Sequence, residues 1–307
     1  MKKVLLHYPD WKNRWEPYVK EALSEFDLTV TSSLEVDELE QLSKDADILV
    51  SMWANQVVQL WTERFPEKKI ITYLRRYEMW SPELMQSIDW RQTDAVVFVS
   101  RWCMETASMM LSDHGLPVPG NQIVIPNGID IDQVPFRESP AKTKKIGMVC
   151  SIKEVKNIPM AFQVLLQLPE DYHLHHIGLP YSSQGICTIM SYIDSIGLTD
   201  RVHFEGTVKR SEVFDWLNDK EVLLSTSLNE GNPNNVIEAM GMGIKPVIHA
   251  WPGARDQFPK DCVFDRVEGA VNMITGDYYD PNFYRQWVMD RYTTSNFKKL
   301  TELVRNI

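Results

Sequence analysis

A short polar turn that begins at Gly231 is the stretch of this sequence best suited to binding an anion. Asn232 is a good helix N-cap, and Pro233 fits the first helical position because its missing N–H would have no partner there. The next backbone N–H groups, those of Asn234 and Asn235, have no partner within the helix and lie at the positive end of its dipole. The sequence therefore predicts that a phosphate or diphosphate binds at this turn.

Two carboxylates flank the turn, with seven residues between them. Glu230 precedes it, and Glu238 lies about one and a half turns inside the predicted helix, at about 3.6 residues per turn. Carboxylates only accept hydrogen bonds, so they select ligands that donate from hydroxyl groups. A ligand with phosphates in its middle and hydroxyl-rich rings at both ends would satisfy the turn and both acids. A sugar nucleotide has that layout.

These residues also carry a family resemblance. Glu230, Glu238 and the small-residue segment 241–243 resemble the E-x7-E signature of the retaining glycosyltransferases of family 4, the glycosyl transferases group 1, which have the GT-B fold. Three more segments resemble this family in the family's order: residues 125–130, which close its first domain, Lys156-Asn157, its phosphate-binding lysine, and residues 202–208, its strand-to-loop unit beside the base. The resemblance covers the second half of the chain well and the first half loosely.

The resemblance implies roles for residues of the second half. Glu230 would hold the hydroxyls of the transferred sugar and stabilise its oxocarbenium character, and Lys156 would offset charge on the leaving diphosphate, so both are candidate catalytic residues. Glu238 would accept from the ribose hydroxyls, and Val208 would lie beside the base. Relatives usually carry an Arg shortly before the lysine, and we expect Lys153 to substitute for it. Each residue also has an alternative without a role in binding. Glu238 would be a helix-surface glutamate, Glu230 a first-turn glutamate that complements the helix dipole, and Lys156 an exposed lysine at a helix start.

The first half supplies the acceptor-side candidates. Many family members have a His near the reacting centre, where this chain has Arg75-Arg76-Tyr77-Glu78 at the end of a predicted strand. Arg76 would bind an anionic acceptor or the diphosphate, and Glu78 would steer an acceptor hydroxyl. A structural ion-pair network is the open alternative for this cluster. Aromatic faces suit sugars, and three tryptophans lie near predicted strand ends: Trp11, Trp53 and Trp80.

No metal or cofactor is expected. Asp130 and Asp132 form a D-x-D, which in the GT-A fold holds a divalent cation, but the surrounding strand pattern of that fold is missing. The helix turn and Lys156 already supply positive charge to a diphosphate. The sequence has neither a G-x-x-x-x-G-K-[ST] nor a G-x-G-x-x-G motif, which excludes the commonest ATPase and dinucleotide-binding sites.

The composition describes a globular chain. Its 307 residues suit two domains, and 44% hydrophobic with 24% charged residues is ordinary for a soluble protein. A formal net charge of −10 argues against nucleic acid as a specific partner. The four cysteines show no C-x-x-C spacing, and neither a signal peptide nor an apolar run of about 18 residues occurs. We therefore expect a cytoplasmic protein with reduced thiols, and contact with a membrane surface stays open.

Elements that would position these residues alternate along the chain. Apolar, β-rich runs take turns with amphipathic helical patterns, which indicates α/β domains with doubly wound, Rossmann-like parallel sheets. Ligands of such sheets bind at the carboxyl ends of the strands. The predicted strands are 4–7, 28–30, 48–52, 70–74, 95–100 and 122–125, then 146–150, 173–177, 202–204, 221–225 and 246–249.

The domain boundaries follow from this pattern and from the resemblance. We expect an acceptor-side domain over residues 1–136 and a nucleotide-sugar-binding domain over residues 145–280, with the Pro-rich, charged segment 134–145 as the linker. The resemblance implies a cleft between the two domains and a C-terminal helix, within residues 281–307, that crosses back to the first domain.

The predicted function is metal-independent transfer of a sugar, most simply a hexose, from a nucleoside diphosphate sugar to an acceptor hydroxyl, with retention implied by the resemblance. The acceptor is a glycan, a lipid-linked saccharide or a small molecule. Two alternatives stay open. A sugar-nucleotide epimerase would need an acid and a base beside the sugar, and a non-catalytic binding protein would fit the missing Arg and a missing glycine pair after the first strand. The base, the sugar, the acceptor and the oligomeric state are left open by the sequence.

Overall fold

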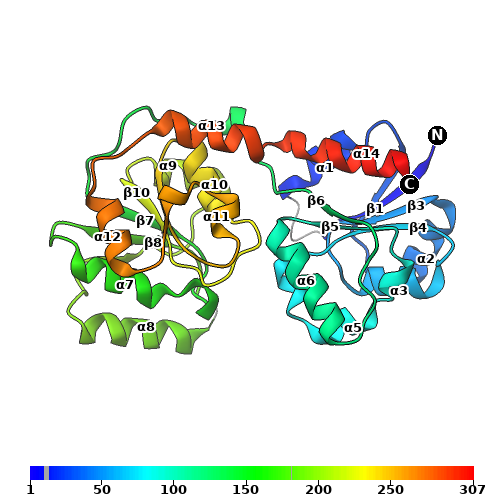
Figure 1. The fold of residues 1–307 in the computed structure, drawn as a ribbon, viewed down its shortest axis with the longest axis horizontal. Coiled ribbons are helices and arrows are strands. Elements are labelled where there is room, and N and C mark those ends of the chain that lie inside the picture. The colour runs from blue at the N-terminus through cyan, green and yellow to red at the C-terminus, as the bar shows by residue number, and fades with distance from the viewer. Residues whose placement is uncertain (10–13, 181) are drawn as a thin grey trace. The chain divides into compact units, whose positions relative to one another are not determined.

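The computed structural model describes residues 1–9, 14–180 and 182–307. Its contacts divide the chain into two compact units: unit 1 comprises residues 1–128 and 294–307, and unit 2 comprises residues 129–293. Within the described residues, each unit is built on one six-stranded parallel sheet with helices in the connections (Figure 1). The predicted α/β class with two doubly wound sheets is confirmed.

Unit 1 has its sheet in the order β2-β1-β3-β4-β5-β6. Its described strands and α-helices are β1 (Lys3–His7), α1 (Glu16–Ala22), β2 (Asp27–Thr31), α2 (Val36–Asp45), β3 (Ile48–Ser51), α3 (Gln56–Arg64), β4 (Lys69–Tyr73), α4 (Arg76–Met79), α5 (Pro82–Ser87), β5 (Ala95–Phe98), α6 (Arg101–Asp113), β6 (Gln122–Val124) and α14 (Lys298–Asn306). Side chains of β1 alternate between two cores: Val4 and Leu6 pack with α1 and α14, whereas Leu5 packs with α2 and α3. Both faces of the sheet are therefore covered.

Unit 2 has its sheet in the order β12-β11-β10-β7-β8-β9. Its described strands and α-helices are β7 (Lys145–Val149), α7 (Ile158–Gln167), β8 (His173–Ile177), α8 (Ser183–Ser195), β9 (Val202–Phe204), α9 (Val213–Leu217), β10 (Val222–Ser225), α10 (Asn234–Gly241), β11 (Lys245–His249), α11 (Ala254–Gln257), β12 (Val263–Phe264), α12 (Val267–Thr275) and α13 (Pro281–Arg291). Leu223 packs with α10 and α13, while Val222 and Leu224 pack with α7 and α12. The two-residue strand β12 is too short for a sequence pattern to reveal.

Each sheet has a point where the strand order reverses. In unit 1, β2 and β3 lie on opposite sides of β1, so the strand order reverses between β1 and β3. In unit 2, β8 and β10 lie on opposite sides of β7, so the order reverses between β7 and β10. Loops that leave such neighbouring strands diverge to opposite faces and leave room for a ligand at the carboxyl ends of the strands. These two switch points are therefore the places to look for binding sites.

The boundary between the units lies at residues 128 and 129, ahead of the predicted linker 134–145. Val134 is buried in the core of unit 2, and the Arg137 amide donates to the Met242 carbonyl at 2.9 Å. Gly243, which follows α10, permits this packing: it has a φ of +81°, and a Cβ on it would lie 2.7 Å from the Arg137 carbonyl oxygen. The apolar side chains of the segment attach it to unit 2, although its composition is typical of a linker.

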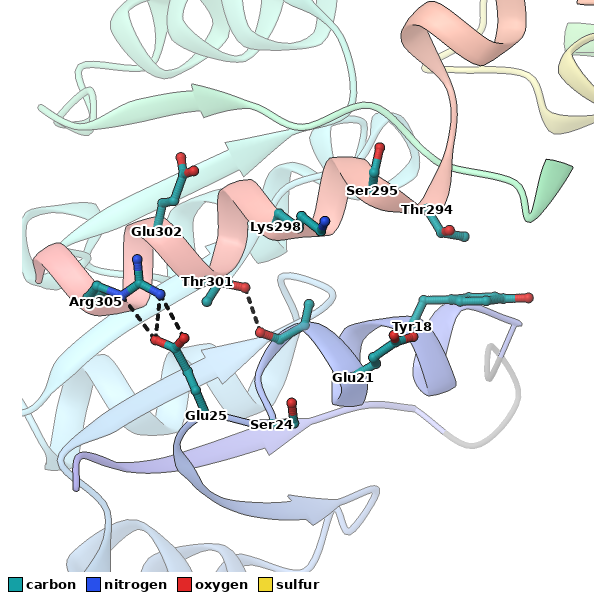
Figure 2. A pocket seen from close by; sticks show the side chains of 11 residues that line it. Tyr18, Glu21, Ser24, Glu25, Thr294, Ser295, Lys298, Thr301, Glu302 and Arg305 are labelled. Carbon is teal, nitrogen blue, oxygen red and sulfur yellow. Dashed lines mark hydrogen bonds and ion pairs between the residues drawn. The ribbon is translucent and has the colours of Figure 1, made fainter. Parts of the chain in front are cut away.

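The C-terminal segment is shared between the units. Tyr284 and Val288 of α13 are buried in the core of unit 2, so only residues 294–307 of the predicted crossing helix belong to unit 1. There α14 lies along α1, where Thr301 Oγ1 donates to the Ala22 carbonyl at 2.5 Å and Arg305 pairs with Glu25 (Figure 2). A polar groove of about 560 Å³ lies beside these contacts. Within the described ranges, no helix combines the length and apolar character that a membrane span requires.

Candidate active site

The predicted donor residues gather at the switch point of unit 2. Lys156 follows β7, at the end of a 3-10 turn over Glu154–Lys156, and Glu230 follows β10. Two hydrogen bonds join these loops: the Leu228 amide donates to the Val155 carbonyl at 2.9 Å, and Thr226 Oγ1 donates to the Lys156 carbonyl at 2.8 Å. The order of the strands therefore brings together residues that lie 74 positions apart in the sequence.

Lys156 and Glu230 are in direct contact, the ammonium with Oε1 of the carboxylate. Ser227 Oγ donates to the same oxygen at 2.7 Å. Both side chains are mostly buried, 18% and 9% exposed, so water screens the pair weakly. An ammonium has three donors and a carboxylate about four acceptor positions. The pair can therefore stay together while Lys156 holds a phosphate oxygen and Glu230 accepts from a hydroxyl.

The helix start differs from the prediction by one residue. Pro233 is the N-cap of α10, and its carbonyl accepts from the Ile237 amide at 3.2 Å. The prediction that Asn232 caps this helix is wrong by one residue. Asn232 Nδ2 donates to Gln257 Oε1 at 2.8 Å. Gln257 Nε2 in turn donates to the Gly231 carbonyl at 3.0 Å. Gln257, which the sequence analysis missed, thus holds the turn from a helix 25 residues away.

The predicted anion turn is well ordered by its asparagines. Asn235 Nδ2 donates to the carbonyl of Val149, the last residue of β7, at 2.9 Å. This bond places the first turn of α10 beside the loop that carries Lys156. Among the described residues, neither Asn229 Oδ1 nor Asn234 Oδ1 has a hydrogen-bond partner, although both atoms are buried. Buried acceptors of this kind suit a ligand that donates hydroxyl hydrogen bonds.

Glu238 is buried, 2% exposed, and is held by an arginine that the sequence analysis missed. Arg210 Nη1 donates to Oε2 at 2.7 Å and Nη2 to Oε1 at 2.5 Å, a bidentate pair. The Arg210 side chain is half exposed and lies 5.4 Å from the centre of the Phe214 ring. The pairing fixes the orientation of the Glu238 carboxylate. A basic residue just after the resembling segment 202–208 was the available signal.

The residue that follows β7 is an uncharged cysteine. Cys150 follows β7, and its Sγ lies 3.6 Å from Nε2 of His176. Burial raises the pKa of the Cys150 thiol to about 12 and lowers the pKa of His176 to about 4. Both groups are therefore uncharged at neutral pH. The positive charge beside Glu230 comes from Lys156.

The other two predicted donor residues lie beside this centre. Lys153 lines a pocket of about 430 Å³ at the starts of α7 and α8, together with Asn157 and Ser182. Val208 lies in the loop after β9, partly buried against the core of unit 2 and two residues before Arg210. The structure thus brings Lys156, Glu230 and the start of α10 together and leaves Lys153 in a neighbouring pocket.

The acceptor-side candidates separate in unit 1. Trp53 and Glu78 line a pocket of about 550 Å³ at the carboxyl ends of β1, β2, β3 and β4, which we call the switch-point pocket. Arg76 and Trp80 are not among its described lining residues, and Trp11 lies outside the described part of the chain. The residues that complete its described lining are Pro9, Ser32, Leu34, Ala54, Asn55, Gln56, Tyr77, Ser81 and Leu84.

Arg75 packs against Trp53, one of the residues that line this pocket. Its guanidinium is buried 4.4 Å from the centre of the Trp53 ring and 4.9 Å from that of Trp15. Arg75 Nη1 also donates to Asn127 Oδ1 at 2.8 Å, and its amide donates to Glu78 Oε2 at 3.2 Å. Burial lowers the pKa of Arg75, and the Glu78 carboxylate opposes that shift. Arg75 therefore acts mainly by packing against aromatic rings, which the pattern Arg75-Arg76-x-Glu78 does not reveal.

Asp130, the first residue of the D-x-D, is hydrogen-bonded within its own turn. Asp130 Oδ1 accepts from the Asp132 amide at 3.3 Å and Asp130 Oδ2 from Gln133 Nε2 at 2.6 Å, which caps a 3-10 turn. In the described ranges there is no cluster of three or more His, Cys, Asp or Glu side chains that could hold a metal ion.

Residues 143–270 match the family model of the glycosyl transferases group 1. The whole chain is similar to HepE of Anabaena, solved in complex with UDP and glucose, with a TM-score of 0.78, 14% identity and 100% of both chains covered. Sucrose-phosphate synthase of Thermosynechococcus elongatus gives a TM-score of 0.78 at 15% identity, over 100% of this chain and 99% of that one. The lipopolysaccharide outer core galactosyltransferase WaaB gives a TM-score of 0.73 at 16% identity, over 100% of this chain and 99% of that one. No curated protein sequence matches the chain.

The fold is GT-B, and the fold and the family match together define the class of glycosyltransferase enzymes. Within that class, the matching family is the glycosyl transferases group 1, carried by unit 2. The resemblance read from the sequence is confirmed. Of the functions that the sequence leaves open, these findings favour the transferase over the epimerase and the non-catalytic binding protein.

Proposed function

We propose that this chain is a retaining glycosyltransferase that moves a sugar, most simply a hexose, from a nucleoside diphosphate sugar to an acceptor hydroxyl without a metal ion. The observation that carries the proposal is the contact between Lys156 and Glu230 beside the first turn of α10. A cation suited to the diphosphate and a carboxylate suited to the sugar hydroxyls meet there, at the strand ends where ligands of parallel sheets bind.

The roles follow from charge and hydrogen bonding. Backbone N–H groups at the start of α10 hold the diphosphate, and Lys156 offsets the negative charge that grows on it as the bond to the sugar breaks. Glu230 accepts from sugar hydroxyls and favours positive charge at the anomeric carbon. Glu238, oriented by Arg210, accepts from the ribose. Retention is an inference from the family resemblance.

UDP is the first nucleotide to test, because HepE has been solved with UDP and with UDP-glucose. Independence from metal is proposed because Lys156 and the helix start supply the charge that a cation would supply. The acceptor is a glycan, a lipid-linked saccharide or a small molecule. Peripheral contact with a membrane would fit the lipid-linked saccharide. We propose a cytoplasmic location, where Cys103, Cys150, Cys187 and Cys262, all unpaired, would stay reduced.

Thermal shift with UDP, GDP and ADP, followed by donor hydrolysis and transfer assays, tests the proposal. One of the diphosphates should raise the Tm, and Glu230→Gln should keep that shift while turnover falls by about 100-fold or more, the range for loss of one group that stabilises transition-state charge. Glu268→Gln, an exposed carboxylate on α12, is the control. Lack of any nucleotide-dependent shift, or full turnover by Glu230→Gln, would contradict the proposed function.

A further inference from the structure

The anion turn, residues 231–235, is held by a buried side chain of α11. Gln257, the last residue of that helix, contacts the turn with both ends of its amide: Oε1 accepts from Asn232 Nδ2 at 2.8 Å, and Nε2 donates to the Gly231 carbonyl at 3.0 Å. Gln257 is 7% exposed, so water competes weakly for either bond. The position of the turn therefore depends on the position of Gln257.

Helix α11 is too short to fix that position by itself. It is one turn of four residues, Ala254–Gln257, and an isolated turn of helix is not stable in water. The Gln257 carbonyl lies at the end of this helix, where carbonyl groups have no partner within the helix. Contacts with other elements must therefore determine where Gln257 lies.

Two donors from the C-terminal segment of unit 2 satisfy that carbonyl. The hydroxyl of Tyr292, the residue after α13, donates to the Gln257 carbonyl at 2.6 Å, and Trp287 Nε1 of α13 donates to it at 3.0 Å. A carbonyl oxygen has two lone pairs, so both are used. The Tyr292 ring also lies 6.1 Å from that of Phe258, the residue after α11, measured between ring centres. The end of α11 is thus bound to the C-terminal segment by hydrogen bonds and by aromatic packing.

Tyr292 is itself fixed by its backbone. Its amide donates to the Val288 carbonyl at 2.7 Å, and its carbonyl accepts from the amide of Ile129, the first residue of unit 2, at 2.8 Å. Tyr292 is 3% exposed, and burial raises the pKa of its hydroxyl, which therefore stays protonated and remains a donor at neutral pH. Tyr292 can therefore hold Gln257 in one place.

We propose that Tyr292 and Gln257 are positioning residues for diphosphate binding. The Tyr292 hydroxyl fixes Gln257, and the Gln257 amide holds the anion turn so that the N–H groups at the start of α10 converge on the phosphates. Donors that are already in position do not have to be ordered when the ligand binds. This inference rests on the proposed function, which assigns the diphosphate to this turn. It adds a residue that lies 35 positions beyond Gln257 in the sequence to the determinants of donor affinity.

Calorimetric titration with UDP and ligand-observed NMR with uridine test this inference on the full chain. Uridine keeps the base and the ribose but lacks the phosphates that the turn would hold. Tyr292→Phe removes only the hydroxyl, so it should weaken UDP binding by roughly three- to tenfold, the effect of one hydrogen bond, and change uridine binding by less than about twofold. Gln257→Met removes both contacts with the turn, so it should weaken UDP binding further, again with little effect on uridine. GDP with guanosine, or ADP with adenosine, replaces this pair if the chain binds another base.

Tyr279→Phe is the matched control. The Tyr279 hydroxyl donates to the Gly243 carbonyl at 2.6 Å, the same length as the bond from Tyr292 to Gln257. Gly243 follows the other end of α10, away from the anion turn. This variant should lower the Tm, as Tyr292→Phe does, and leave the affinities for UDP and uridine unchanged.

The outcomes separate the inference from the proposed function. Equal weakening of UDP and uridine binding in Tyr292→Phe, unchanged UDP affinity in that variant, or an equal loss of UDP affinity in Tyr279→Phe would overturn the inference, because the hydroxyl would then act on general stability or not at all. Failure of the unmodified chain to bind UDP, GDP and ADP would instead contradict the proposed function, and the inference with it.

Discussion

The Arg210 guanidinium donates to both carboxylate oxygens of Glu238, although 28 residues separate them in the sequence. Glu238 is almost fully buried, and an ionised carboxylate without a partner is costly in such surroundings. Arg210 is half exposed, so one end of the pair reaches solvent while the other end is the buried Glu238 of α10. The pair therefore holds the Glu238 carboxylate in one orientation.

Removal of Arg210 should lower both stability and nucleotide binding. Arg210→Ala leaves Glu238 buried without its cation, which we expect to cost about 1 to 3 kcal/mol of unfolding free energy, near the lower end because Arg210 is half exposed. Arg210→Lys keeps the charge but loses the bidentate geometry, so it should lower stability and nucleotide binding less than Arg210→Ala does. Urea unfolding and UDP titration measure the two effects. Equal stability of Arg210→Ala and the unmodified chain would show that the pair contributes nothing.

Lys156 should contribute to diphosphate binding directly. Lys156→Ala is expected to weaken that binding by about 1 to 3 kcal/mol, the range for loss of a charged hydrogen bond. It also leaves Glu230 without its cation, so the variant should be less stable. Calorimetric titration with UDP measures the affinity, and Lys260→Ala, an exposed lysine of unit 2, is the control. Unchanged affinity would remove Lys156 from the site.

The double variant Lys156→Met with Glu230→Gln separates the two consequences. It removes both charges together, so stability should recover relative to Lys156→Ala while diphosphate binding stays weak. Recovery of both properties would mean that Lys156 only neutralises Glu230.

Stability should fall as the solution is acidified through the titration of His176. Burial lowers the pKa of His176 from 6.5 to about 4, so between these values the unfolded chain binds a proton that the folded chain does not. The contribution of neutral His176 to the free energy of unfolding is present in full above about pH 6.5. It is lost as the pH falls to about 4, which lowers the free energy of unfolding by up to about 3 kcal/mol. Urea unfolding of the unmodified chain and of His176→Gln at two pH values measures it. The variant should depend less on pH, and identical dependence would rule out His176 as a cause.

Docking of the C-terminal helix should be required for the stability of unit 1. Leu300 of α14 is fully buried in the core that also contains Val4 and Leu6, so Leu300→Ala should cost about 2 to 5 kcal/mol. Arg305→Ala, which removes an exposed ion pair with Glu25, should leave the Tm nearly unchanged. Equal Tm values for the two variants would show that α14 contributes little packing energy.

Chelation should leave nucleotide binding intact. Excess EDTA is expected to change the affinity for UDP by less than about twofold, because Lys156 and the helix start supply the positive charge. Asp130 is engaged by the backbone of its own turn. A large loss on chelation, restored by Mg²⁺ or Mn²⁺, would return Asp130 and Asp132 to the list of candidate ligands.

Local patterns were sufficient for several features of this chain. The alternation of helical and strand patterns along the chain predicts two doubly wound sheets. The helix start near Pro233 and its flanking acids can be seen in the sequence because capping signals act within a few residues. Lys156 was found through its resemblance to a family segment, and the structure places it in contact with Glu230.

Features that depend on strand order were beyond such patterns. Arg210 meets Glu238, Gln257 accepts from Asn232, and Cys150 meets His176, each because the fold brings distant segments together. The switch-point pocket likewise requires four strand ends that only the order β2-β1-β3-β4 makes neighbours. Short-range periodicity shows which residues face a core, but the partners of a buried polar group depend on which strands are adjacent. The counter-ions and the pocket therefore emerge only once the chain is folded.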